Sequence, residues 1–193
     1  MKAPSRMRGM LAAGALLAVA ACSTVAAHEL QENRATLVQR DTGFVSVTLY
    51  IDLPAALHRT LAPRRSFEEF ALAHANLPPA PFKAKLVEAT GRMQAEMRVT
   101  TAKGSALAFE QWVWPDAARV QAALLERLMD AVVARGSHPQ VAPWEVHAEL
   151  HSTVPITALR VQFTPALGRV MVVSYRPRQV WVDMNSVSST ITF

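Results

Sequence analysis

The sequence predicts an α+β fold, with a largely antiparallel β-sheet or sandwich and a helical middle section packed on it. Apolar and polar residues alternate near both ends of the chain, and apolar residues recur at helical spacing in the middle. Strands and helices do not alternate regularly, which argues against a parallel α/β fold. Because no internal repeat or low-complexity linker interrupts the pattern, we expect residues 28–193 to form a single exported domain.

The start of the chain predicts export. Lys2, Arg6 and Arg8 precede the apolar run Gly9–Ala21, and small residues follow, which is the layout of a secretory signal peptide. The run is about 13 residues long, whereas a membrane-spanning helix needs about 20, so we exclude residues 1–27 from the fold. The expected location is the periplasm or the space outside the cell.

Two cleavage sites compete, and they give different products. Cleavage after Val25-Ala26-Ala27 would make His28 the first residue. The alternative is cleavage after residue 21, because Val19-Ala20-Ala21-Cys22 resembles the lipobox of bacterial lipoproteins. In that case Cys22 would carry a lipid anchor and tether the domain to a membrane.

Charge and cysteine content exclude several classes of protein. Twenty Lys and Arg residues face 15 Asp and Glu residues, and three of the basic residues lie in the signal, which leaves a net charge of about +2. Such a balance argues against a nucleic-acid partner, which requires a basic face. Cys22 is the only cysteine, so the exported domain can form no disulfide within itself. No further apolar run reaches transmembrane length.

The segment 34–52 is predicted to form a β-hairpin. Apolar residues take every second position from Val45 to Ile51, which places one face of a strand on a core. We expect Asp41-Thr42-Gly43 to supply the turn, with Gly43 at a positive φ, and Pro54 to end the second strand.

Three helices and six further strands complete the expected fold. Ser66 and Glu69 have the spacing of a capping box, and Pro115 precedes the most strongly amphipathic stretch. The expected helices are Ser66–Leu77, Phe82–Met93 and the segment from Pro115 to Gly136. The expected strands are Ala95–Thr100, Leu107–Trp114, Trp144–Val154, Leu159–Thr164, Val170–Tyr175 and Val180–Val182.

One predicted strand carries a candidate metal site. Because side chains alternate along a strand, Glu145, His147, Glu149 and His151 share one face, with neighbours roughly 6.6 to 7 Å apart. Two imidazoles and two carboxylates at this spacing can converge on copper, nickel or zinc. The alternative is an ordinary solvated face of a half-exposed strand.

His28 is a second candidate ligand if it becomes the first residue. Its free amine and its imidazole nitrogen could then chelate one copper ion, and His147 or His151 could complete the site. Under the alternative, His28 only marks the cleavage junction.

No sequence motif predicts catalysis. The chain has no G-x-S-x-G elbow, P-loop or G-x-G-x-x-G, and the exported part has no cysteine nucleophile. Large aromatics cluster at the ends of predicted strands, where they either seal a core or bind a partner. These residues are Trp112, Trp114, Trp144 and Trp181.

Three segments together resemble a known family. The signal ends in Ala27-His28, the hairpin leads to Ile51–Leu57, and a late run covers Pro165–Tyr175. These segments resemble the exported amino-terminal part of HupE/UreJ-like proteins, and small uncharacterised exported proteins of proteobacteria. HupE/UreJ-like proteins carry several membrane helices and are associated with nickel supply. Since this chain lacks that membrane part, the resemblance implies only an accessory role near the envelope, and no binding residue is carried over.

The sequence therefore predicts a non-enzymatic periplasmic or envelope-associated domain that binds a partner protein. The alternative is a metal-binding accessory protein for copper or nickel, with His147, His151, Glu149 and His28 as ligands. An exported hydrolase would require paired carboxylates or a Ser-His pair to meet in a pocket.

Overall fold

The computed structural model describes residues 33–133 and 142–177, and in this part of the chain no helix is long and apolar enough to span a membrane. The expected signal, His28, Cys22, Gly136 and the expected strand Val180–Val182 lie outside the described residues.

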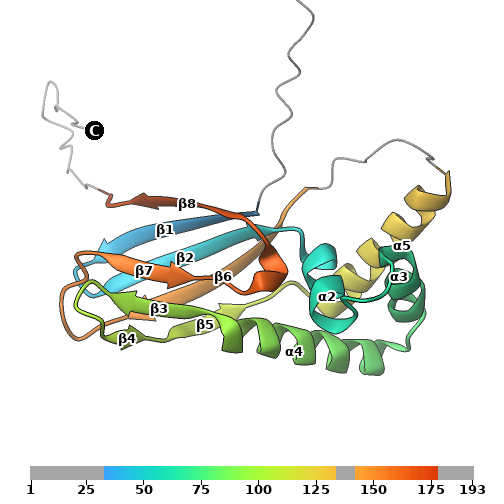
Figure 1. Cartoon of the computed structure of the whole chain (residues 1–193), viewed down its shortest axis with the longest axis horizontal. Helices are drawn as coiled ribbons and strands as arrows, with labels where there is room; N and C mark the ends of the chain where they lie inside the picture. The colour runs from blue at the N-terminus through green and yellow to red at the C-terminus, as the bar shows by residue number, and fades with distance from the viewer. Residues whose placement is uncertain (1–32, 134–141, 178–193) are drawn as a thin grey trace, which may run out of the picture. The chain divides into compact units, whose positions relative to one another are not determined.

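Two β-sheets and four α-helices make up the described part, which confirms the α+β class (Figure 1). The larger sheet has the order β5-β6-β2-β1-β8, and the smaller sheet has the order β4-β3-β7. All neighbouring strands are antiparallel except β1 and β8, which run parallel. The strands are β1 (Asn33–Asp41), β2 (Phe44–Ile51), β3 (Arg98–Thr101), β4 (Ala106–Leu107), β5 (Phe109–Val113), β6 (Trp144–His151), β7 (Leu159–Gln162) and β8 (Val170–Tyr175).

The helix start predicted from the sequence at Ser66 is confirmed. The capping box at Ser66 is present, since its hydroxyl accepts a hydrogen bond from the Glu69 N–H while the Glu69 carboxylate accepts one from the Ser66 N–H. Gly91 does not end its helix, which continues to Glu96. The helices are α2 (Leu53–Leu61), α3 (Phe67–Ala75), α4 (Pro79–Glu96) and α5 (Ala117–Val133), and a short 3₁₀ helix, η1, covers Pro165–Leu167.

Helix α2 was not predicted from the sequence. Pro54 does follow the end of β2, but it stands in the first turn of α2, where its missing N–H costs nothing. Asp52 caps this helix, because its carboxylate accepts a hydrogen bond from the Ala55 N–H at 3.1 Å. A strand-ending proline and a helix-starting proline look alike in the sequence.

The expected strand Leu107–Trp114 is divided between the two sheets. Its first part, β4, pairs with β3, whereas β5 pairs with β6 in the larger sheet. The expected strand Trp144–Val154 ends earlier, at His151. The hairpin of β1 and β2 is confirmed, with Arg34 opposite Tyr50 and Leu37 opposite Val47.

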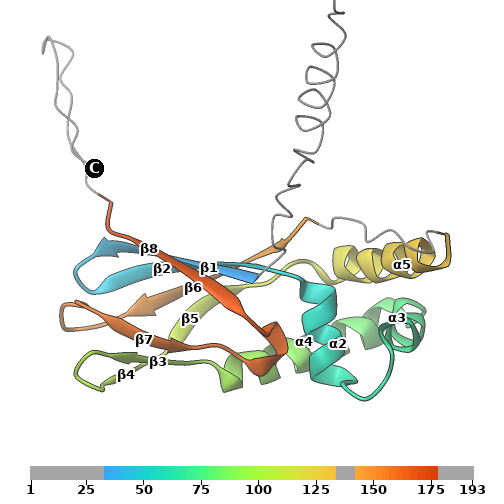
Figure 2. The same cartoon turned by 45° about the horizontal axis from the view of Figure 1, so that its top comes forward.

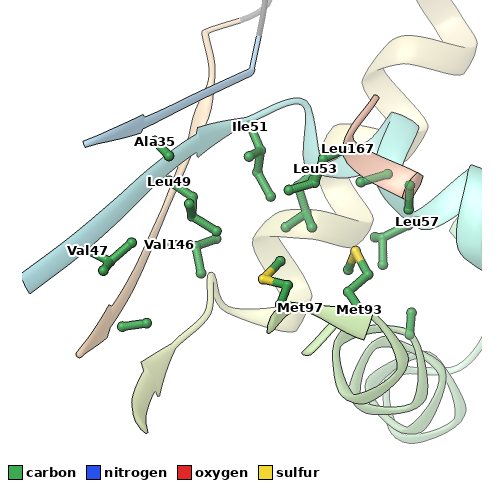
Figure 3. Packing of buried hydrophobic residues seen from close by; sticks show 14 of the residues in the cluster. Ala35, Val47, Leu49, Ile51, Leu53, Leu57, Met93, Met97, Val146 and Leu167 are labelled. Carbon is green, nitrogen blue, oxygen red and sulfur yellow. The ribbon is translucent and has the colours of Figure 1, made fainter. Parts of the chain in front are cut away.

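The core lies between the larger sheet, the smaller sheet and helices α2 and α4 (Figure 3). Buried residues take alternate positions along β2, the first part of β1 and most of β6, for example Leu49 and Val146. They share a cluster with Met93 of α4 and Met97, which follows this helix. The opposite face of the larger sheet therefore carries mainly polar side chains and is open to solvent. The ionisable side chains of β6 lie on this open face.

The turn between β1 and β2 needs glycine for a different reason from the expected one. Gly43 does not have a positive φ; that conformation occurs among the described glycines at Gly104 and Gly168. Instead, a Cβ at position 43 would lie 2.3 Å from the backbone oxygen of Ser152. The glycine allows the β1–β2 turn and the segment after β6 to touch backbone to backbone.

Candidate functional site

The sequence-predicted row of ionisable side chains lies on the open face of the larger sheet. Glu145, His147, Glu149 and His151 all project from β6 to this face, and the two imidazoles are about half exposed. The prediction that these four side chains share one face agrees with the structure.

The row is divided into two imidazole–carboxylate pairs. His147 Nε2 lies 3.4 Å from Glu145 Oε1, and its Nδ1 lies 3.3 Å from the Thr48 hydroxyl oxygen. His151 Nε2 lies 3.0 Å from Glu149 Oε2, and its ring stacks on Phe44 with 4.8 Å between centroids. Within residues 33–133 and 142–177, no three His, Cys, Asp or Glu side chains are placed to hold one metal ion together.

One end of this row opens into a groove of about 780 Å³. The groove runs between α5, the connection from β5 to α5, and the start of β6; we call it the α5–β6 groove. It includes His147, so the predicted row and the groove form one continuous surface. Its lining residues are Val113, Trp114, Pro115, Asp116, Arg119, Ala123, Glu126, Arg127, Asp130, Ala142, Pro143, Trp144, Glu145 and His147.

The spacing of residues on α5 explains the wall of the groove. Asp116 stands immediately before the helix and caps it, because its carboxylate accepts hydrogen bonds from the N–H groups of Ala118 and Arg119. Groove residues then recur every three or four positions, which is one face of a helix. Val120 and Leu124 are fully buried and fix that helix on the core.

Negative charge dominates the groove. Four carboxylates and two guanidinium groups line it. Arg127 forms an ion pair with Asp52, at 2.9 Å from Oδ1, and Arg119 lies over the Trp144 ring at 5.4 Å from its centroid. Among the described residues, Glu126 and Asp130 form no ion pair. The groove therefore presents carboxylates that a positively charged ligand can neutralise.

Two residues that line the groove carry buried hydrogen-bond donors. The indole Nε1 of Trp114 and the Nε of Arg127 are shielded from solvent and have no acceptor in the described part of the chain. A buried donor without an acceptor costs about 1 to 3 kcal/mol. Trp114 stacks on Trp112 with 5.6 Å between ring centroids, which holds its indole in place.

The sequence pointed to part of this surface only. His147 lies in the groove, whereas Glu149 and His151 lie farther along the same strand, outside the groove lining. His28 and Cys22 fall outside the described residues, so their predicted roles stay predictions. Arg127 was not predicted as a site residue, and neither were Glu126 and Asp130, because nothing in the sequence shows which strand faces the amphipathic helix that carries them.

Comparison with known proteins identifies no relative: no family model, no curated protein and no solved structure matches this chain. The resemblance to HupE/UreJ-like proteins therefore stays a prediction.

Proposed function

We propose that this chain is an exported, non-enzymatic binding domain of the cell envelope, and that it holds a segment of a partner protein in the α5–β6 groove. The observation that supports this most is the presence of two unpaired carboxylates, those of Glu126 and Asp130, in a groove that Trp114 and Trp144 also line.

A polypeptide segment with a basic residue matches this groove. Its Lys or Arg side chain pairs with Glu126 and Asp130, which have no ion-pair partner among the described residues. Trp114 and Trp144 add large rigid surfaces of the type found at the centre of protein interfaces.

Reversing the charge of the groove should abolish the complex. In the double variant Glu126→Lys, Asp130→Lys, we expect about tenfold or greater loss of the cross-linked complex that the unaltered chain forms in formaldehyde-treated cells of its native host. Glu126 is exposed and Asp130 is half-buried, and neither belongs to the buried core, so the fold should be retained, which circular dichroism checks.

The control is Glu110→Lys, which reverses one carboxylate on the exposed edge strand β5, outside the groove lining. The control should form the complex as the unaltered chain does. Equal recovery from the double variant and the control would refute the proposal, as would the absence of any complex with the unaltered chain.

A metal-binding accessory role is the second candidate, and the observation that favours it is the exposed row of His147, Glu149 and His151 on β6. Bringing both imidazoles to one copper or nickel ion requires each to leave its carboxylate partner. His28 would add ligands if cleavage makes it the first residue.

Titration of the full exported chain with Cu²⁺ or Ni²⁺ tests the second candidate. If this role is correct, about one equivalent binds, and the double variant His147→Ala, His151→Ala loses that binding by about tenfold or more. His58→Ala is the control, because His58 lies on α2, away from β6. Unchanged affinity in the double variant would rule out these ligands.

A further inference from the structure

A second groove, of about 560 Å³, lies where the two sheets separate; we call it the β7–β8 groove. Leu159 and Val161 of β7 line one side, and Val172 and Ser174 of β8 line the other.

Both strands beside this groove are edge strands. β8 ends the larger sheet and β7 ends the smaller sheet, and within the described residues each pairs with a neighbour on one side only. Figure 2 shows β7 beside β3, on the side away from β4, and β8 pairs with β1 on the side away from β2. Unpaired N–H and C=O groups at such an edge form a template for another strand.

Within the residues that the structure describes, β8 lacks the charges, prolines and bulges that usually prevent strand addition. At the opposite edge of the same sheet, β5 has a charged Glu110, a register shift before Val113, and Gln111 at a φ of 53°. β8 has no charged residue, proline or glycine, and its register with β1 is continuous. Met171, Val172 and Tyr175 are each about half exposed there.

The charge at the rim of the groove is complementary to an acidic ligand. Arg176 lines the groove and is exposed, whereas Arg160 lies on the opposite face of β7 from the lining residues Leu159 and Val161. The one carboxylate next to a lining residue, that of Asp41, accepts a hydrogen bond from the Thr42 N–H. No carboxylate lines the groove itself.

We propose that an extended segment of a partner polypeptide, with alternating apolar residues and carboxylates at its ends, adds as a strand to the free edge of β8 and fills the β7–β8 groove. Main-chain hydrogen bonds to β8 would supply affinity, and alternate side chains would enter the groove beside Val172 and Val161. This surface shares no lining residue with the α5–β6 groove, so each proposal can be tested without the other.

Hydrogen exchange of the full exported chain tests this inference with a defined probe. The probe is the acetylated peptide Glu-Val-Thr-Val-Thr-Val-Glu, and the control peptide has lysine at both ends. We expect the glutamate peptide to slow exchange of the β8 amides by about tenfold or more, and the lysine peptide to bind more weakly.

Two neighbouring positions provide matched variants. Val172 lines the groove and Met171 does not, yet both are 50% exposed. Val172→Lys should remove the protection by the peptide, because it places a charge where apolar side chains would enter. Met171→Lys should retain it, as should the variant Glu126→Lys, Asp130→Lys.

Three results would overturn the inference. The first is no slowing of β8 exchange by the glutamate peptide. The second is slow exchange of the β8 amides in the free chain that becomes fast when residues 178–193 are removed. That result would mean that these residues, and not a partner, occupy the edge of β8. The third is protection of the β8 amides that increases with protein concentration while the mass in solution doubles. That result would mean that a second copy of this chain occupies the edge of β8.

Discussion

Replacing Gly43 with alanine should destabilise the fold by about 2 to 3 kcal/mol, as expected for overpacking against an atom that cannot move away. The added Cβ would lie 2.3 Å from the backbone oxygen of Ser152. The backbones must separate, and two hydrogen bonds join them: Ser152 N–H to Gly43 O at 2.8 Å and Ile156 N–H to Thr42 O at 2.6 Å. Urea unfolding followed by circular dichroism measures the loss.

Gly91→Ala is the matched control, with an effect of opposite sign. Gly91 is exposed in the middle of α4, and nothing lies within 4 Å of a Cβ built there. Alanine in a helix interior is favoured over glycine by about 0.5 to 1 kcal/mol, so this variant should be more stable than the unaltered chain. Equal stability of the two alanine variants would contradict the close approach at Gly43.

Replacing Asp52 with alanine should have the second large effect, a loss of about 2 to 3 kcal/mol. The loss combines the cap of α2, worth about 1 kcal/mol, with the ion pair to Arg127. The Arg127 side chain is only 15% exposed, and one of its nitrogens already lacks an acceptor, so removing its partner leaves a poorly solvated charge. Urea unfolding again provides the measurement.

Asp52→Asn separates the two contributions. An asparagine oxygen still caps a helix and still accepts a hydrogen bond from a guanidinium, but it carries no charge. We therefore expect about half the loss seen with alanine. If Asp52→Ala unfolds at the same urea concentration as the unaltered chain, the ion pair between α5 and the start of α2 does not contribute to stability.

Local signals in the sequence predicted the fold where neighbouring residues decide the structure. The alternation in Val45–Ile51 and the pairing of Ser66 with Glu69 each act within a few residues, and both predictions are confirmed. The apolar stripe of Phe82, Leu86, Ala89 and Met93 is likewise buried as one face of α4.

Features that depend on distant parts of the chain could not be predicted in the same way. The parallel pairing of β1 with β8 joins residues more than 130 positions apart, and no local pattern encodes it. The need for glycine at position 43 arises from Ser152, and the place of Arg127 in a groove arises from β6. Alternation along β6 did place His147, Glu149 and His151 on one face, but it could not show that each imidazole lies beside its own carboxylate.

The central proposal is that the α5–β6 groove holds a partner protein, and photo-cross-linking from inside the groove tests it most directly. A photoreactive phenylalanine analogue replaces Ala123, which lines the groove, and in a separate chain it replaces Val87, which is 62% exposed on α4. After irradiation of cells of the native host, we expect one discrete protein adduct from position 123 and none from position 87. Adducts of the same mass and yield from both positions, or none from position 123, would contradict the proposal.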